Sequence, residues 1–269
     1  MNRRLSVAIM QRFACFYDRK KPRYGVNIAA VEPATRYAVP GRVEDAGVDA
    51  KGSKPIIGIP VYDSVDMLDV SGPYEMFTWA GFEVELVAAE SRLHCFREGF
   101  RFEVIKSFGE ASPDYAALWV PGGDPTALNK LMKDQTYLGF LRDKAAVTPL
   151  VASVCEGAML LAAAGLLDGY EATTHWAFIP CLKRYQKVKV VEGHPRYHLD
   201  RDRLTGGGIS SGIDEALRLI ELLMGTAKAQ QVQLTTQYFP CPPVSGVIPD
   251  TKDCPLDEAG DQVPLCIPC

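Results

Sequence analysis

The stretch that decides the fold is Val151-Ala152-Ser153-Val154-Cys155-Glu156-Gly157-Ala158-Met159-Leu160-Leu161. A short apolar run ends at Cys155, and a helix-forming run begins just after it. This order predicts a strand, a sharp turn and a helix, with the cysteine at the corner and Gly157 allowing the tight turn. The positive end of the helix would favour a thiolate, the nucleophilic form of cysteine. The plain alternative is a buried cysteine that ends a core strand, because free cysteine usually behaves as a small hydrophobic residue.

The composition outside this stretch indicates a globular protein. The chain has 269 residues, of which 47% are hydrophobic, and its net charge is −4. Nothing global indicates a nucleic-acid partner, and no stretch approaches the roughly 18 apolar residues of a membrane span. Among eight cysteines, Cys95, Cys155 and Cys181 lie in patterned sequence, which suits a reducing compartment. We therefore expect a cytoplasmic protein without nucleic-acid or membrane partners.

The two ends of the chain differ from its middle. Residues 1–54 begin with seven basic residues against one acid, Asp18, and show no helix or strand period. We expect a disordered extension there, with a transit peptide or an over-long start as alternatives, and no secretory signal. Deleting residues 1–50 should leave fold and activity intact. The globular domain is predicted over residues 55–240, and residues 241–269 form a tail.

The C-terminal tail is rich in proline and cysteine. From Pro240 to Cys269 it holds seven prolines, four cysteines and five acids. This composition predicts neither a helix nor a core. The spacing of Cys266 and Cys269 could bind zinc or act in redox exchange, but no second tight pair accompanies it. We therefore favour a disordered tail.

Between the two ends, strands alternate with helices. We expect strands at 56–62, 82–87, 100–105, 116–120, 151–155, 172–176 and 188–191, a hairpin at 199–204, and helices at 74–80, 128–145, 158–166, 176–185, 213–224 and 226–238. Ser71 is the expected cap of the first helix. The alternation predicts an α/β fold, a three-layer α/β/α sandwich around a mainly parallel sheet.

Candidate functional residues follow the strands of this sheet. The crevice of a parallel sheet lies beyond the carboxyl ends of its strands, and Asp69, Gly122-Gly123 and Cys155 each follow a strand. The two glycines let backbone N–H groups approach a substrate, as an oxyanion hole requires. Taken alone, Asp69 could be a helix cap and Gly122-Gly123 an ordinary turn. Their coincidence with Cys155 favours an active site.

Several motifs together resemble one family. They are Leu68-Asp69-Val70-Ser71-Gly72-Pro73, Val120-Pro121-Gly122-Gly123, Ser153-Val154-Cys155-Glu156-Gly157, Ala164-Gly165-Leu166-Leu167-Asp168-Gly169, Ala172-Thr173-Thr174-His175-Trp176 and Thr205-Gly206-Gly207-Gly208-Ile209. In order and spacing they resemble the ThiJ/PfpI superfamily, which implies the flavodoxin-like, class I glutamine amidotransferase-like fold with a nucleophile elbow. Among its members, isonitrile hydratases are most similar. Sensor domains of AraC-type regulators share the motifs, but carry a downstream helix-turn-helix domain for which this chain leaves no room.

The resemblance implies a mechanism and partners. Cys155 would attack the carbon of a small isonitrile, Asp69 would handle the proton and orient water, and a thioimidate would hydrolyse to an N-substituted formamide. Backbone N–H groups of Gly123 and Glu156 would polarise the substrate. The resemblance further implies a homodimer, with no metal and no organic cofactor.

Glu156 departs from the family pattern. Isonitrile hydratases carry threonine directly after the nucleophile, and peptidase-like members carry histidine. A carboxyl group can replace the donating hydroxyl only when protonated, and burial would raise its pKa. Activity should then fall as pH rises. If Glu156 instead works as an ionised base, the chemistry would differ from the isonitrile template.

Other roles stay open at this point. His175 could serve as a catalytic base or bind substrate, although packing is the more common role for such a residue. Metal binding at His94, His194 or His198 is not expected, because none has a partner at ligand spacing. Two alternative functions are a ligand-sensing or protein-binding module without turnover, and a glyoxalase or redox-stress protein that acts through Cys155.

Overall fold

A computed structural model of the protein describes residues 54–258. The described residues belong to two compact units, residues 239–247 to the first and residues 54–238 and 248–258 to the second. Within residues 239–247, the described part of the first unit, no helix or strand is assigned. The predicted extension up to residue 53 and the pair Cys266 and Cys269 lie outside the described residues. The boundaries at residues 54 and 240 therefore stay predictions.

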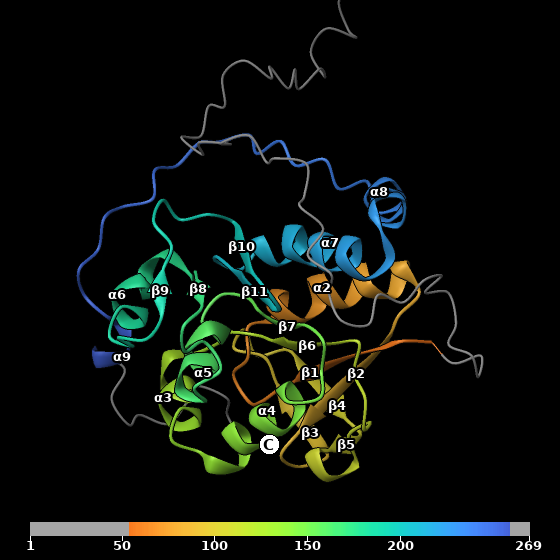
Figure 1. Ribbon diagram of the computed structural model, residues 1–269, viewed down its shortest axis with the longest axis horizontal. Coiled ribbons are helices and arrows are strands. Elements are labelled where there is room, and N and C mark those ends of the chain that lie inside the picture. The colour runs from red at the N-terminus through yellow and green to blue at the C-terminus, as the bar shows by residue number, and fades with distance from the viewer. Residues whose placement is uncertain (1–53, 259–269) are drawn as a thin grey trace, which may run out of the picture. The chain divides into compact units, whose positions relative to one another are not determined.

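The second unit is built on a seven-stranded sheet (Figure 1). Its strands in chain order are β1 (Ile56–Pro60), β2 (Glu83–Ala88), β5 (Lys106–Ser107), β6 (Ala117–Val120), β7 (Val151–Ser153), β10 (Tyr197–Asp200) and β11 (Arg203–Gly206). In space they follow the order β10-β11-β7-β6-β1-β2-β5. All neighbours are parallel except β10 and β11, which form the predicted hairpin.

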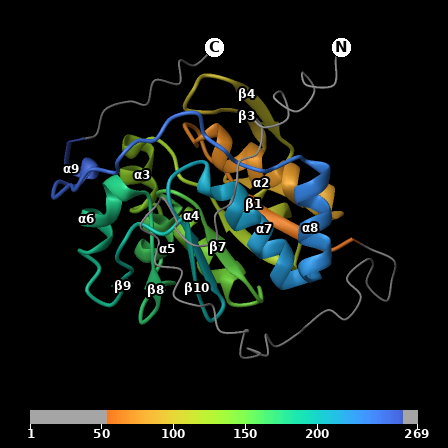
Figure 2. The same cartoon turned by 90° about the horizontal axis from the view of Figure 1, so that it is seen from above.

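Helices cover both faces of this sheet, as Figures 1 and 2 show. One layer contains α2 (Met67–Ala80), α7 (Ser211–Met224) and α8 (Thr226–Thr235), which contact one another. The other contains α3 (Pro125–Leu131), α4 (Gln135–Ala145), α5 (Gly157–Ala163) and α6 (Ile179–Leu182). The predicted three-layer, flavodoxin-like α/β fold is confirmed.

The central strands are apolar because both of their faces are covered. All four residues of β6 are fully buried, as are Val151 and Ala152 of β7. Strands of this kind read as continuous hydrophobic runs, without the alternation of a half-exposed sheet. This is why the runs at 116–120 and 151–155 could be assigned from the sequence.

Three helix predictions need correction. Helix α2 begins at Met67, before Ser71, whose hydroxyl donates to the Met67 carbonyl within the helix and caps nothing. The helix expected over 128–145 is two helices, α3 and α4, because Asp134 accepts the backbone N–H of Thr136 and starts a new helix there. The helix expected over 176–185 is a 3₁₀ turn, η2 (Trp176–Phe178), followed by the short α6.

Smaller elements lie around the sheet. Strands β3 (Arg92–Cys95) and β4 (Arg101–Val104) form an antiparallel pair, and β8 (Glu171–Ala172) pairs in parallel with β9 (Lys189–Val190). A 3₁₀ turn, η1 (Phe108–Glu110), follows β5, and α9 (Pro255–Glu258) is the last described helix. None of the helices in residues 54–258 is long and apolar enough to cross a membrane.

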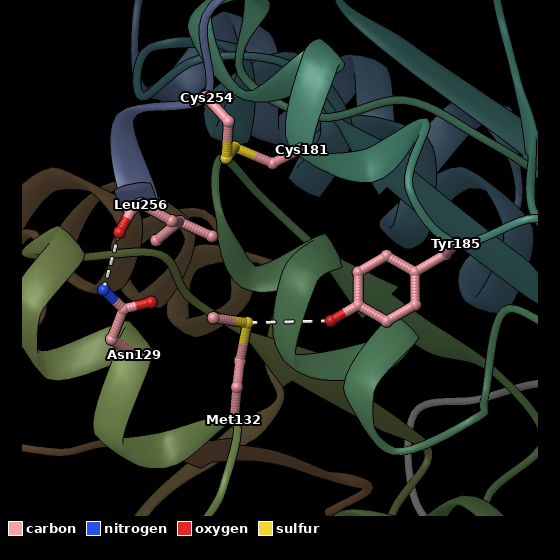
Figure 3. Close-up of a disulfide and its surroundings, with 6 residues drawn as sticks. All are labelled: Asn129, Met132, Cys181, Tyr185, Cys254 and Leu256. Carbon is pink, nitrogen blue, oxygen red and sulfur yellow. Dashed lines mark hydrogen bonds between the residues drawn. A yellow bond between two sulfur atoms is a disulfide. The ribbon is translucent and has the colours of Figure 1, made fainter. Parts of the chain in front are cut away.

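Within the second unit, the segment of residues 248–258, here called the strap, is bonded to α6 by a disulfide (Figure 3). Cys254 is buried and bonds Cys181 of α6, and the Asn129 side chain of α3 donates to the Leu256 carbonyl at 2.9 Å. A cavity of about 250 Å³ lies beside this disulfide. The prediction of a tail without helix or core is therefore wrong for the strap. A proline-rich composition does not show that a cysteine will be anchored elsewhere.

The remaining cysteines also differ from expectation. Cys95, Cys181, Cys241 and Cys254 are all disulfide-bonded, and Cys155 is the free cysteine of residues 54–258. Disulfides persist mainly in oxidising compartments. The argument that Cys95 and Cys181 suit a reducing environment is therefore wrong, and the cytoplasmic location stays a prediction.

Candidate active site

Cys155 lies at a tight corner between β7 and α5. Its backbone φ is 55°, a strained conformation for a residue with a side chain. The corner is held by the Cys155 N–H, which donates to the Gly207 carbonyl at 2.9 Å, and by the Thr174 hydroxyl, which donates to the Cys155 carbonyl at 2.7 Å. A Cβ on Gly157 would lie 2.1 Å from the Val120 oxygen, so only glycine fits there. The predicted strand, turn and helix are confirmed.

The Cys155 thiol is completely buried, and its pKa is raised well above the usual value. Burial is the main cause, followed by the negative charges of Asp69 and Glu156 and a hydrogen bond with the Glu156 side chain. A hydrogen bond with the Ile209 backbone lowers the pKa of the thiol, but by less. The sequence argument that the helix end favours a thiolate is therefore outweighed, and the resting group is a thiol whose proton needs an acceptor.

Glu156 is the N-cap residue of α5 and is 4% exposed. Burial raises the pKa of its carboxyl to about 7, and the hydrogen bond with Cys155 opposes that rise. The sequence prediction that burial raises this pKa is confirmed by the direction of the shift. A carboxyl group with a pKa near 7 can both accept and return a proton near neutral pH.

Asp69 lies in the first turn of α2 and has no exposed surface. One of its oxygens, Oδ2, accepts the Gly122 N–H at 2.9 Å. Its pKa is raised well above the usual value by burial and by the nearby charges of Glu156 and Asp66. Burial thus favours the protonated form of Asp69, and the carboxyl group of Glu156 titrates near neutral pH.

Gly122 and Gly123 follow β6 and allow close packing around the thiol. A Cβ on Gly122 would lie 2.4 Å from Glu156 Oε2 and 2.9 Å from the Cys155 Cβ. The Gly122 N–H is already bound by Asp69. Gly123 lies opposite Val65 in an isolated antiparallel bridge, whose two hydrogen bonds do not use the Gly123 N–H. Of the two glycines, Gly123 is thus the better candidate donor to a substrate.

His175 packs beside the site and is held by backbone contacts. Its Nδ1 accepts the Ala177 N–H at 3.2 Å, and its ring occupies the space where a Cβ on Gly208 would lie, 2.2 Å from the ring carbon Cδ2. Burial lowers its pKa. These contacts support packing and helix capping over a role as catalytic base.

Two functional candidates escaped the sequence analysis. Asp66 is 1% exposed, and its Oδ1 accepts from Arg97, which lies after β3, at 3.2 Å. The spacing of Asp66 and Asp69, three residues apart at a helix start, was a usable signal. Arg97 is 31 residues from Asp66 in the sequence, so no local pattern pointed to their contact.

Asp66, Asp69, Cys155 and Glu156 form what we call the elbow cluster. Each offers one potential metal-ligand atom, and these four atoms lie within 4.8 Å of one another. All four residues are buried. The geometry thus brings together the three predicted catalytic residues, adds a third carboxyl group, and has the composition of a cation site.

Known proteins similar to this chain share its domain. A sequence profile of the DJ-1/PfpI family matches residues 56–222. An isonitrile hydratase from Pseudomonas putida is 38% identical over 205 residues, which are 76% of this chain and 87% of that protein. The crystal structure of a ThiJ/PfpI family protein from Pseudomonas syringae superposes with a TM-score of 0.67 at 31% identity, covering 71% of this chain and 78% of that one. The HTH-type transcriptional regulator GbdR from Pseudomonas aeruginosa is 35% identical over 86 residues, which are 31% of this chain and 23% of the regulator.

Proposed function

Because this chain belongs to the DJ-1/PfpI family, we propose that it is a cysteine-dependent hydro-lyase that hydrates a small isonitrile to an N-substituted formamide. The observation that carries the proposal is the buried Cys155 thiol, hydrogen-bonded to Glu156 and clustered with Asp69. The similarity to an isonitrile hydratase over most of its length supports the substrate class. Full burial of Cys155 favours a small substrate.

In the first step, the ionised Glu156 carboxylate accepts the thiol proton of Cys155. The sulfur then forms a bond with the isonitrile carbon, and protonated Asp69 delivers its proton to that same carbon. The product is a thioimidate on Cys155, with Glu156 now protonated and Asp69 ionised. Splitting the reaction through a covalent intermediate replaces one difficult step with two easier ones.

In the second step, the Asp69 carboxylate takes a proton from water, and the oxygen attacks the thioimidate carbon. The carbon–sulfur bond breaks, Glu156 returns its proton to the leaving sulfur, and the product at this point is the formimidic acid R–N=CH–OH. Its hydroxyl proton then moves to the nitrogen, and the formamide is released. The net reaction is R–N≡C plus water giving R–NH–CHO, and all three residues return to their starting states. The two carboxyl groups are given separate roles because their partners differ: Glu156 is hydrogen-bonded with the Cys155 thiol, and Asp69 with the Gly122 N–H.

This scheme changes the role first expected for Glu156. The family threonine suggested a donor, whereas the hydrogen bond between the Cys155 thiol and Glu156 supports an acceptor. The proposed chemistry is still isonitrile hydration. Glu156, which replaces the family threonine, is proposed to activate the Cys155 thiol by accepting its proton. Gly123 is the proposed backbone donor to the substrate, and His175 is proposed to shape the site.

A ligand-sensing module is the second candidate function. It is favoured by the match to a segment of a transcriptional regulator and by the complete burial of Cys155. A sensor would bind its ligand at the elbow cluster without releasing a product. A homodimer is also proposed from the family resemblance, and light scattering should give twice the mass of one chain.

The test is a turnover assay with alkyl and aryl isonitriles, with nitriles and 2-oxoaldehydes as competing substrate classes. We expect formamide to form in equal amount to the isonitrile consumed, read by NMR, and Cys155→Ser to form it at least about 10³-fold more slowly. Turnover of 2-oxoaldehydes alone would move the assignment to glyoxalase chemistry. Saturable binding of an isonitrile without any product would favour the sensor.

A further inference from the structure

The elbow cluster contains more buried acid than the proposed reaction uses. Asp66, Asp69 and Glu156 are between 0% and 4% exposed, and Cys155 is fully buried beside them. The hydration scheme needs two carboxyl groups and leaves Asp66 without a role. Burying an additional carboxyl group is costly unless something compensates it.

Each of the three carboxyl groups has a hydrogen-bond partner. Asp66 Oδ1 accepts from Arg97, Asp69 Oδ2 accepts from the Gly122 N–H, and Glu156 is bonded with the Cys155 thiol. Within residues 54–258, the second oxygens, Asp66 Oδ2, Asp69 Oδ1 and Glu156 Oε2, have no hydrogen-bond partner although they are buried. Carboxylates that are fixed on one oxygen and open on the other are typical of metal ligands with an outer layer of hydrogen bonds.

The carboxyl groups and the thiol are close enough to share one ion. One ligand atom from each of the four residues lies within 4.8 Å of the others. Ligand atoms of a tetrahedral zinc site are about 3.5 Å apart, given zinc bonds of about 2.0 to 2.3 Å. A bound ion would therefore draw these atoms together by about 1 Å.

The ligand types select the ion. Ca²⁺ and Mg²⁺ take six or more oxygen ligands and do not use sulfur, whereas Zn²⁺ is held by four ligands that include thiolate and carboxylate. Arg97 is a cation bound to Asp66, and its side chain is 46% exposed. Arg97 contacts the cluster through Asp66 Oδ1. A divalent ion would neutralise the negative charge that remains on the other carboxyl groups.

We propose that Asp66, Asp69, Cys155 and Glu156 bind one Zn²⁺ ion, and that the bound ion blocks Cys155. On binding, the protons of the Cys155 thiol and of the Asp69 carboxyl group leave to solvent. The sulfur lone pair is then used by the metal, so it cannot attack a substrate. The binding itself stands on the geometry alone. Its regulatory consequence rests on the proposed function, because it makes zinc a reversible inhibitor of the hydration.

The test titrates the full-length protein with Co²⁺ as a spectroscopic substitute for Zn²⁺. Thiolate-bound Co²⁺ gives a near-ultraviolet charge-transfer band that carboxylates alone do not give. We expect one equivalent to produce the band, Zn²⁺ to abolish it by displacement, and Cys155→Ser to lose it. Asp66→Asn should weaken binding by at least about tenfold, whereas Asp168→Asn, at an exposed ion pair with Lys187, should leave it unchanged.

A second variant separates this site from the C-terminal cysteines. Cys266→Ser combined with Cys269→Ser removes the CxxC pair, and the band should survive. Loss of the band in this variant, or an unchanged band in Cys155→Ser, would overturn the proposal. Circular dichroism checks that each variant is folded. Because metal binding is read without turnover, a failed hydration assay and a failed metal site give different results.

Discussion

Two cysteine-containing regions of this protein place sulfur in opposite chemical states. In the elbow cluster, a free thiol is fully buried beside three carboxyl groups at a strained turn. In the strap, Cys254 is also buried and is bonded to Cys181, and the two Cα atoms are 5.0 Å apart. Both regions contact α5 or its neighbours, and both lack exposed sulfur. The difference shows that burial alone does not define a functional cysteine.

The surroundings of each sulfur explain this difference. Cys155 has a proton acceptor, Glu156, and the negative charges of Asp69 and Glu156 raise the pKa of its thiol. Cys181 and Cys254 close a long segment of chain, with 73 residues of separation, and are joined by packing and the Asn129–Leu256 hydrogen bond. We therefore expect the elbow to determine activity and the strap to determine stability.

The largest expected effect is on turnover. Cys155→Ser should reduce formamide formation by about 10³-fold or more, because serine is a far weaker nucleophile in a covalent mechanism. Its melting temperature should stay close to that of the wild type, since the two side chains differ by one atom. The strap variant Cys181→Ser with Cys254→Ser should keep its activity. Equal losses of activity in both variants would remove the proposed division of roles.

The next effect concerns stability and should be confined to the strap. Removing the disulfide by Cys181→Ser with Cys254→Ser should lower the free energy of unfolding by about 2–4 kcal/mol, because the unfolded chain regains the freedom of a long loop. Urea denaturation measures this change. A variant as stable as the wild type would show that the strap adds nothing to the fold.

The acids of the elbow should make stability depend on pH. Glu156 has a pKa of about 7 in the folded protein, above the usual 4.5, so the folded state holds more protons between these values. The free energy of unfolding should therefore fall as pH rises from about 4.5 to 7, by up to about 3 kcal/mol. Asp66 and Asp69 shift in the same direction and add to this slope. Glu156→Gln should flatten it, and an unchanged slope would contradict the burial argument.

A smaller effect compares two glycines on neighbouring helices. Gly157→Ala should destabilise the protein by about 1–3 kcal/mol, because the new methyl group would meet the Val120 carbonyl. Gly139→Ala in α4, where nothing lies within 4 Å of the new Cβ, should stabilise it by about 0.5–1 kcal/mol. Thermal unfolding of both variants measures the contrast. Similar changes in both would mean that the elbow is not tightly packed.

The sequence allowed the elbow to be predicted because its signals are local. Cys155, Glu156 and Gly157 are adjacent, and a strand, a turn and a helix follow from the residues beside them. The strap could not be predicted, since disulfide connectivity between distant cysteines is not encoded in their spacing. The same limit applies to the contact between Arg97 and Asp66, because these residues are 31 positions apart in the sequence. The fold of the chain after β3 places Arg97 beside Asp66.

The helix boundaries show a second kind of limit. Ser71 and Asp134 are both residues that favour helix starts, yet only Asp134 caps one. Helix α2 begins at Met67, before Ser71, and its N-cap residue Asp66 makes no side-chain capping bond. Local capping preference thus agreed with the structure at Asp134 and failed at Ser71.

The pH dependence of kcat/KM for isonitrile hydration tests the central claim most directly, because it reports the ionisation of the free enzyme. If Glu156 accepts the thiol proton of Cys155, kcat/KM should rise about tenfold per pH unit below a pKa near 7 and level off above it. Glu156→Gln should abolish this rise and lower the plateau. A profile that is flat or falls between pH 5.5 and 8.5 in the wild type would contradict the account, and a fall would return Glu156 to the role of a donor.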